Sequence, residues 1–199
     1  DVPAADAHLQ VGIALGMLPR LAQKTDSLDE FLEVMLPDAL RCMADYMSER
    51  IRFIEERSNF FESNFLSTEG LIDRKRFTAM FGMVGLAEAA NHFAGGKRYG
   101  HDKEADDIAD RIMTVISDFA ASYEAPYCEI SGHRLLLHAQ VGIDTDHGIT
   151  SGVRIPVGEE PERMYDHLRH SARFHRFFPT GCSDIFAFEI TGRDNPAAM

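Results

Sequence analysis

Histidines and aspartates gather over residues 133–147, where their types could bind a metal ion or a polar substrate. The group consists of His133, His138, Asp144, Asp146 and His147, which fall within fifteen positions. Zinc requires three or four converging imidazole, thiolate or carboxylate ligands. Because His133 and His138 are five residues apart, they would point to opposite faces of a regular strand. The spacing therefore favours a substrate-facing or structural role, and no metal is assigned.

Cys182 is the cysteine whose surroundings best suit chemistry. It lies in a Gly-Cys-Ser-Asp segment, which is typical of a tight loop that presents sulfur to a ligand. A nucleophilic thiol needs a neighbouring base, and His175 is the nearest histidine in the sequence. The alternative is a buried cysteine without a chemical role. We expect Cys42, on a predicted helix, and Cys128, at a predicted strand start, to be inert.

One basic stretch occurs near the carboxyl end of an otherwise acidic chain. It could receive an anion or a segment of a partner. Alternatively it is a solvated helix end, where cationic side chains are favoured by the helix dipole. The stretch contains His167, Arg169, His170, Arg173, His175 and Arg176.

Composition limits the classes of partner. The 199 residues include 20 Lys plus Arg against 32 Asp plus Glu, a formal charge of -12, which disfavours nucleic acid and anionic membranes. A hydrophobic content of 45% supports a packed core. Three cysteines without CxxC spacing, and no apolar run long enough to span a bilayer, predict a cytoplasmic protein. The first residue is Asp1, and we expect the chain to be a piece of a larger enzyme.

A long amphipathic helix is predicted over residues 28–54. Ser27 and Glu30 form a capping box, and apolar residues then repeat at three and four positions. Pro37 predicts a bend. Further helices are predicted over residues 87–91, 102–123 and 159–170, the last with Pro161 in its first turn.

Strand-like segments alternate with these helices. Residues 9–20 are predicted as a buried strand or tight turn, with a short helix as the alternative. Other strands are predicted over residues 77–86, 128–140, 148–156 and 185–188. The alternation favours an α/β layer or barrel.

Two motifs resemble glycyl radical enzymes. Residues 77–89, FTAMFGMVGLAEA, resemble an apolar strand followed by a G-x-x-G-L-x-E-A turn and helix. Residues 16–22, GMLPRLA, resemble the LPRIA strand that precedes it in anaerobic class III ribonucleotide reductases. With residues 131–138 and 181–186, the resemblance is to the YjjI-type proteins, which carry a domain of unknown function, and it covers essentially the whole chain.

This resemblance implies a ten-stranded α/β barrel of two antiparallel halves, enclosing a cysteine loop and a glycyl radical loop. A radical-SAM activase installs the radical, which passes to the cysteine and then to substrate. The sequence contains no R-V-x-G-Y-like string, and Cys182 follows both motifs, whereas the family's thiyl cysteine precedes them. We therefore expect residues 1–199 to be a single fragment, a partial (half) barrel that corresponds to the second half of the family's barrel. It would lack both radical-bearing loops and have no cofactor of its own.

The resulting hypothesis is a central segment of a glycyl radical enzyme, inactive alone, which contributes walls to a small-molecule pocket. Its partners would be the substrate, the radical-SAM activase and, through an exposed apolar face, a second copy in a homodimer. The alternatives are a metal-dependent hydrolase or lyase built on the His/Asp cluster and a non-catalytic interaction domain. The predicted wall residues are His133, His138, Asp144, His147 and Glu88, with Cys182 as the catalytic candidate.

Overall fold

Three parallel strands form the only sheet in the part of the chain that is described. The computed structural model describes residues 9–15, 17–139, 148–179 and 181–186. Strands β1 (Leu9–Ala14), β2 (Phe77–Gly82) and β3 (Leu136–His138) lie in the order β1-β2-β3. All six residues of β2 are buried, as expected for the central strand of a parallel sheet.

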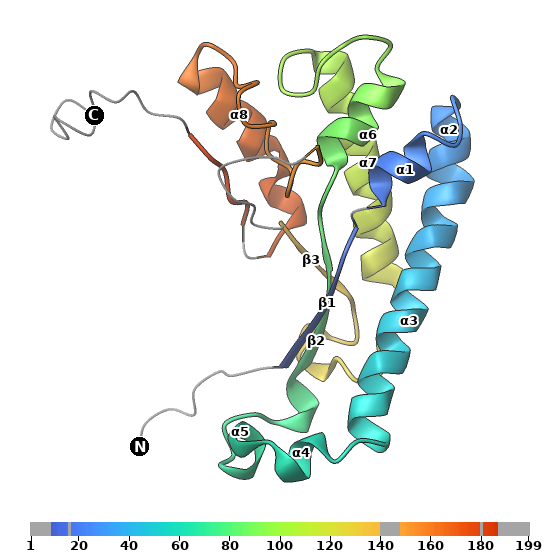
Figure 1. Cartoon of the computed structure of the whole chain (residues 1–199), viewed down its shortest axis with the longest axis vertical. Coiled ribbons are helices and arrows are strands. Elements are labelled where there is room, and N and C mark those ends of the chain that lie inside the picture. The colour runs from blue at the N-terminus through green and yellow to red at the C-terminus, as the bar shows by residue number, and fades with distance from the viewer. Residues whose placement is uncertain (1–8, 16, 140–147, 180, 187–199) are drawn as a thin grey trace, which may run out of the picture.

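Two long helices provide the crossovers that parallel strands require (Figure 1). Helix α3 (Leu36–Glu56) connects β1 to β2 and packs on β1, and α7 (Lys103–Ser122) connects β2 to β3 and packs on β3. The two helices also contact each other, so they form one layer along the sheet. The shorter helices are α1 (Leu18–Ala22), α2 (Leu28–Glu30), α4 (Phe60–Ser63), α5 (Phe65–Thr68), α6 (Leu86–Phe93) and α8 (Met164–Phe174). Single 3₁₀ turns occupy Arg74–Arg76, Glu129–Ser131 and His175–Phe177.

The predicted helix start near the amino end is confirmed, and the helix departs from regular α-helical hydrogen bonding directly before Pro37. The Ser27 hydroxyl accepts a hydrogen bond from the Glu30 backbone N–H at 3.2 Å, as in a capping box. A π-helical turn (Phe31–Met35) then leads into α3 directly before Pro37. Proline has no N–H to donate to the preceding turn, so the hydrogen-bonding pattern changes there.

Strand predictions in the second half of the chain were largely wrong. Among the described residues 128–139 only β3 is a strand, and Gly132 and His133, with φ values of 65° and 60°, interrupt the segment before it. Residues 148–156 make one isolated antiparallel bridge, between Ser151 and Val84, instead of a strand. Residues 185–186 form no strand, and 187–188 lie outside the described residues.

The last helix also differs from its prediction. Helix α8 begins at Met164 and extends to Phe174, so Pro161 precedes it and does not lie in its first turn. The predictions for α6 and α7 agree with the structure within two residues. None of the described helices is long and apolar enough to cross a membrane.

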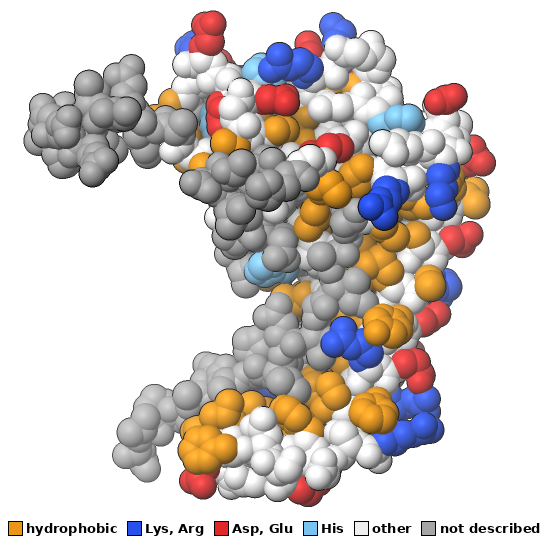
Figure 2. Space-filling view, viewed as in Figure 1, with side chains coloured by type: hydrophobic (Ala, Val, Ile, Leu, Met, Phe, Trp, Pro, Cys, Tyr) orange, Lys and Arg blue, Asp and Glu red, His pale blue; other side chains and the backbone are white. Residues whose placement is uncertain are grey.

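The core lies between the sheet and its helical layer, where large side chains such as Phe31, Phe77 and Phe81 are fully buried. Other apolar side chains remain on the surface, and Figure 2 shows a group of them over α4 and α5. Mixed helix and parallel strand content confirms the α/β class. Three strands do not by themselves make half of a ten-stranded barrel, so the barrel stays a proposal.

Candidate functional site

The two family-like motifs meet where adjacent parallel strands end. The backbone N–H of Leu15, just after β1, donates to the carbonyl of Gly82 at 2.7 Å. Gly85 follows β2 with φ of 85°, and a Cβ atom there would lie 2.6 Å from two ring carbons of Pro19. Only glycine combines this left-handed conformation with so close an approach. The start of α1 therefore packs directly on the turn that begins α6.

A later segment crosses the end of β2. The backbone N–H of Gly152 donates to the carbonyl of Met83 at 2.9 Å, and that of Gly85 donates to the carbonyl of Thr150 at 2.8 Å. On the other side, the N–H of Met83 donates to the carbonyl of His138 at 3.0 Å. Carboxyl ends of parallel strands and the turns that follow them are a usual place for ligand sites in α/β sheets. We call this region the carboxyl edge.

Glu88 is held at the carboxyl edge by Thr150. One oxygen, Oε1, accepts hydrogen bonds from the Thr150 backbone N–H at 2.8 Å and from its hydroxyl at 2.6 Å. The other oxygen, Oε2, is buried and has no hydrogen-bond partner in the described structure. Because Glu88 lies in the first turn of α6, the helix dipole also favours its carboxylate. The result is an oriented carboxylate whose second oxygen has no hydrogen-bond donor among the described residues.

His138 and His133 lie at opposite ends of β3. His138 ends the strand at the carboxyl edge, where it is half-buried and its ring makes no hydrogen bond to any described residue. His133 precedes the strand, is exposed, and has its Nδ1 3.2 Å from the carbonyl of Pro126. The structure therefore does not bring the two histidines together.

The predicted His/Asp cluster has three further members. Asp144, Asp146 and His147 lie outside the described residues. Within the described ranges, no group of three or more His, Cys, Asp or Glu side chains is positioned to hold a metal ion. The metal-dependent hydrolase thus gains no support from His133 and His138.

Cys182 is partly buried against the core. Burial, and secondarily the nearby Asp184 carboxylate, raises the pKa of its thiol to about 11. A cysteine with this pKa is protonated at neutral pH, which disfavours nucleophilic attack by a thiolate. His175 lies near Gly181, but no hydrogen bond joins it to the sulfur. Among the residues placed by the structure, none supplies the base that the nucleophile hypothesis required.

Burial has the same effect on Cys128, whose pKa is also raised to about 11. Cys42 is exposed.

Sequence reasoning missed Thr150 as the partner of Glu88, since a threonine 62 residues away carries no local signal of that contact.

Comparison with known proteins agrees with this architecture. A family described as Glycyl radical enzyme YjjI-like matches residues 13–199. An uncharacterised protein of Haemophilus influenzae (strain ATCC 51907 / DSM 11121 / KW20 / Rd) is 41% identical over 189 residues, covering 92% of this chain and 37% of that protein. The uncharacterised protein YjjI of Escherichia coli (strain K12) is 37% identical over 186 residues, covering 92% of this chain and 36% of that protein. The chain thus spans little more than a third of these relatives.

Two solved structures share the fold. The anaerobic ribonucleotide reductase of Thermotoga maritima with citrate in the active site superposes with a TM-score of 0.65 at 14% identity, covering 89% of this chain and 34% of that one. The same reductase in complex with dATP and CTP superposes with a TM-score of 0.64 at 15% identity, covering 87% of this chain and 31% of that one. At these identities the likeness shows the fold alone. Together with the family match over nearly the whole sequence, it leads to one conclusion: the chain belongs to the YjjI-like family of glycyl radical enzymes.

Proposed function

We propose that this chain is a central segment of a glycyl radical enzyme and that its carboxyl edge forms part of the substrate pocket. One observation supports this most strongly. The motif with Pro19 and the motif with Gly85 lie far apart in sequence but pack together at adjacent strand ends. In a complete barrel, such strand ends would surround the reacting substrate. The three-stranded sheet with its outer helical layer would then be part of that barrel.

Glu88 and His138 are the described groups that best suit a small oxygenated substrate. The Glu88 carboxylate can accept a hydrogen bond or a proton through Oε2, while Thr150 keeps Oε1 in place. The imidazole of His138 can donate or accept a hydrogen bond. Both groups bind and orient substrate in this proposal. Asp144 and His147 remain candidates for the same wall.

The radical itself belongs to the parent enzyme. When installed by a radical-SAM activase, it supplies hydrogen-atom abstraction. The sequence has no R-V-x-G-Y-like string to carry it, and Cys182 follows both motifs, so no radical step is assigned to these residues. We expect the isolated chain to be inactive.

The test uses the full-length parent activated without oxygen by its radical-SAM partner. Electron paramagnetic resonance should detect a glycyl radical, and a metabolite extract treated with the activated enzyme should lose one or more compounds by mass spectrometry. Glu88→Gln should leave the radical signal intact but slow this loss by at least about tenfold, the lower range for general acid–base groups.

Glu104→Gln is the matched control, because Glu104 is an exposed carboxylate in the first turn of α7. It should behave as the natural enzyme. A full-length parent protein that never acquires a radical would contradict its assignment as a glycyl radical enzyme. A radical-bearing Glu88→Gln variant that consumes the metabolite at the normal rate would contradict only the role of the carboxyl edge.

A further inference from the structure

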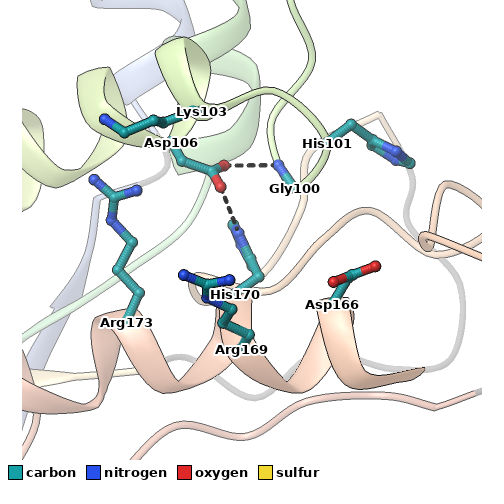
Figure 3. A pocket seen from close by; sticks show the side chains of 8 residues that line it. All are labelled: Gly100, His101, Lys103, Asp106, Asp166, Arg169, His170 and Arg173. Carbon is teal, nitrogen blue, oxygen red and sulfur yellow. Dashed lines mark hydrogen bonds and ion pairs between the residues drawn. The ribbon is translucent and has the colours of Figure 1, made fainter. Parts of the chain in front are cut away.

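The basic stretch of the sequence folds into one wall of a cavity. The cavity has a volume of about 520 Å³ and lies between α8 and the first turn of α7. Its size falls within the usual range for small-molecule sites. Figure 3 shows Lys103 and Arg173 at one end, Asp166 and His101 at the other, and Arg169 and His170 between them. We propose that this cavity, which we call the α7–α8 cavity, binds the phosphate group of a small phosphorylated molecule.

Cations from two helices converge at one end of the α7–α8 cavity. Arg169 and Arg173 are four residues apart on α8 and so share a face of that helix. Asp107 holds Arg173 beside Lys103, accepting from the arginine at 2.6 Å and from the lysine at 2.5 Å. These hydrogen bonds lower the pKa of the Asp107 carboxyl, and the bond from Lys103 has the larger effect. The interhelical pairing fixes two cationic side chains before any ligand arrives.

Arg169 is the cation whose N–H groups are unpaired among the described residues. Its guanidinium makes no hydrogen bond or ion pair with the described residues, although it lines the α7–α8 cavity. A guanidinium presents several N–H groups in a planar fork that matches a phosphate group. Since the whole chain carries a formal charge of -12, a cavity lined by three cations is a local exception.

His170 supplies a second, independent indication of a ligand. Its side chain is 5% exposed, its Nδ1 lies 3.2 Å from the Asp106 carboxylate, and its ring packs edge-on against Tyr99. The other ring nitrogen, Nε2, is buried without a hydrogen-bond partner in the described part of the chain. An unsatisfied buried polar atom costs roughly 1–3 kcal/mol, so a bound polar group that reached Nε2 from the cavity would stabilise this arrangement.

The start of α7 adds backbone donors to the same place. The side chain of its N-cap residue, Asp102, does not cap the helix and instead accepts from the backbone N–H of Arg98 at 2.8 Å. A helix of 20 residues therefore begins at the cavity without a side-chain cap, and such termini attract anions.

The two carboxylates that line the cavity form no ion pair with its lysine or its two arginines, although Asp107 and Asp110 pair with Arg173 from outside the lining. Asp106 already accepts from the Gly100 backbone N–H and pairs with His170. Asp166 lies at the opposite end, 3.8 Å from Arg163. This separation favours a ligand with a phosphate at one end and a neutral polar part at the other. The site differs from the carboxyl edge, and the proposal does not depend on that region's role.

The test measures binding to the full chain by isothermal titration calorimetry at constant ionic strength. Pyrophosphate and glucose 6-phosphate are the probes, and sodium chloride controls for salt. We expect saturable binding that Arg169→Gln and Lys103→Gln each weaken by about tenfold or more. Tighter binding of glucose 6-phosphate would assign the site to phosphorylated metabolites. Tighter binding of pyrophosphate would assign it to free phosphate anions.

Arg111→Gln is the matched control, because Arg111 is an exposed arginine on α7 that pairs with Asp29 away from this cavity. It removes the same charge and should leave both affinities unchanged. The proposal is overturned if neither probe binds saturably. It is also overturned if Arg111→Gln weakens binding as much as Arg169→Gln does.

Discussion

At the scale of single residues, the contact between Gly85 and Pro19 joins the two motifs that mark this family. Gly85 has no side chain, and this leaves room for the Pro19 ring. The backbone is left-handed, and the Pro19 ring occupies the volume where a Cβ atom would lie. A methyl group at this position would therefore be strained twice, by conformation and by collision.

Gly85→Ala should lower the free energy of unfolding by more than left-handed strain alone. Gly96 is the matched control, because its φ is 90° but no other atom lies within 4 Å of the place that an alanine methyl group would occupy. We expect Gly96→Ala to cost about 1 kcal/mol. Gly85→Ala should cost about 2 kcal/mol more from overpacking against the proline ring. Urea denaturation of both variants measures this difference, and equal losses would mean that the contact is easily relieved.

At the scale of elements, α8 is tied to the chain that follows it by a buried polar group. Asp184 lies 3.1 Å from Nε2 of His167 and accepts a hydrogen bond from the Ser171 hydroxyl. The ring of Phe186 packs over His167 with centroids 4.4 Å apart. Because His167 and Asp184 are almost fully buried, each needs the other as a partner.

Asp184→Ala should destabilise the protein by about 3–5 kcal/mol, the usual cost of leaving one member of a buried pair alone. Chemical denaturation measures the change. Asp118→Ala removes an exposed carboxylate from α7 and should change stability by less than about 0.5 kcal/mol. A small loss for Asp184→Ala would show that α8 holds its position without the following segment.

At the scale of the whole molecule, the described chain leaves many large apolar side chains uncovered. Phe65 is 67% exposed on α5, and Leu66 and Leu71 lie near it in sequence with 43% and 44% exposed. Figure 2 shows this end of the molecule as an apolar group. Such surfaces usually contact another protein surface. In a chain that spans about a third of its relatives, we expect the partner to be the rest of the parent or a second copy.

The isolated chain should therefore self-associate, with a sedimentation coefficient that rises with protein concentration. Phe65→Glu should reduce this association, since it places a charge within the apolar group. Tyr165→Glu is the control, because Tyr165 is similarly exposed but belongs to α8. A chain that stays monomeric at every concentration would contradict both the exposed interface and the homodimer prediction.

The sequence alone determined the elements whose signals are local. The capping box at Ser27, the apolar periodicity of α3 and α7, and the continuous apolar run of β2 all depend on neighbours along the chain. The same kind of local evidence identified the motifs at Pro19 and Gly85, and with them the family.

Only the tertiary structure decided which distant groups share a site. Apolar segments after residue 126 look strand-like, but backbone reversal at Gly132 and His133 leaves β3 three residues long and separates His133 from His138. Likewise, Glu88 meets Thr150 across 62 residues, and Arg173 meets Asp107 across 66. Periodicity shows which face of an element is buried, but it does not show which other element covers that face. Contacts of this range arise only when the crossovers bring separate strands and helices together.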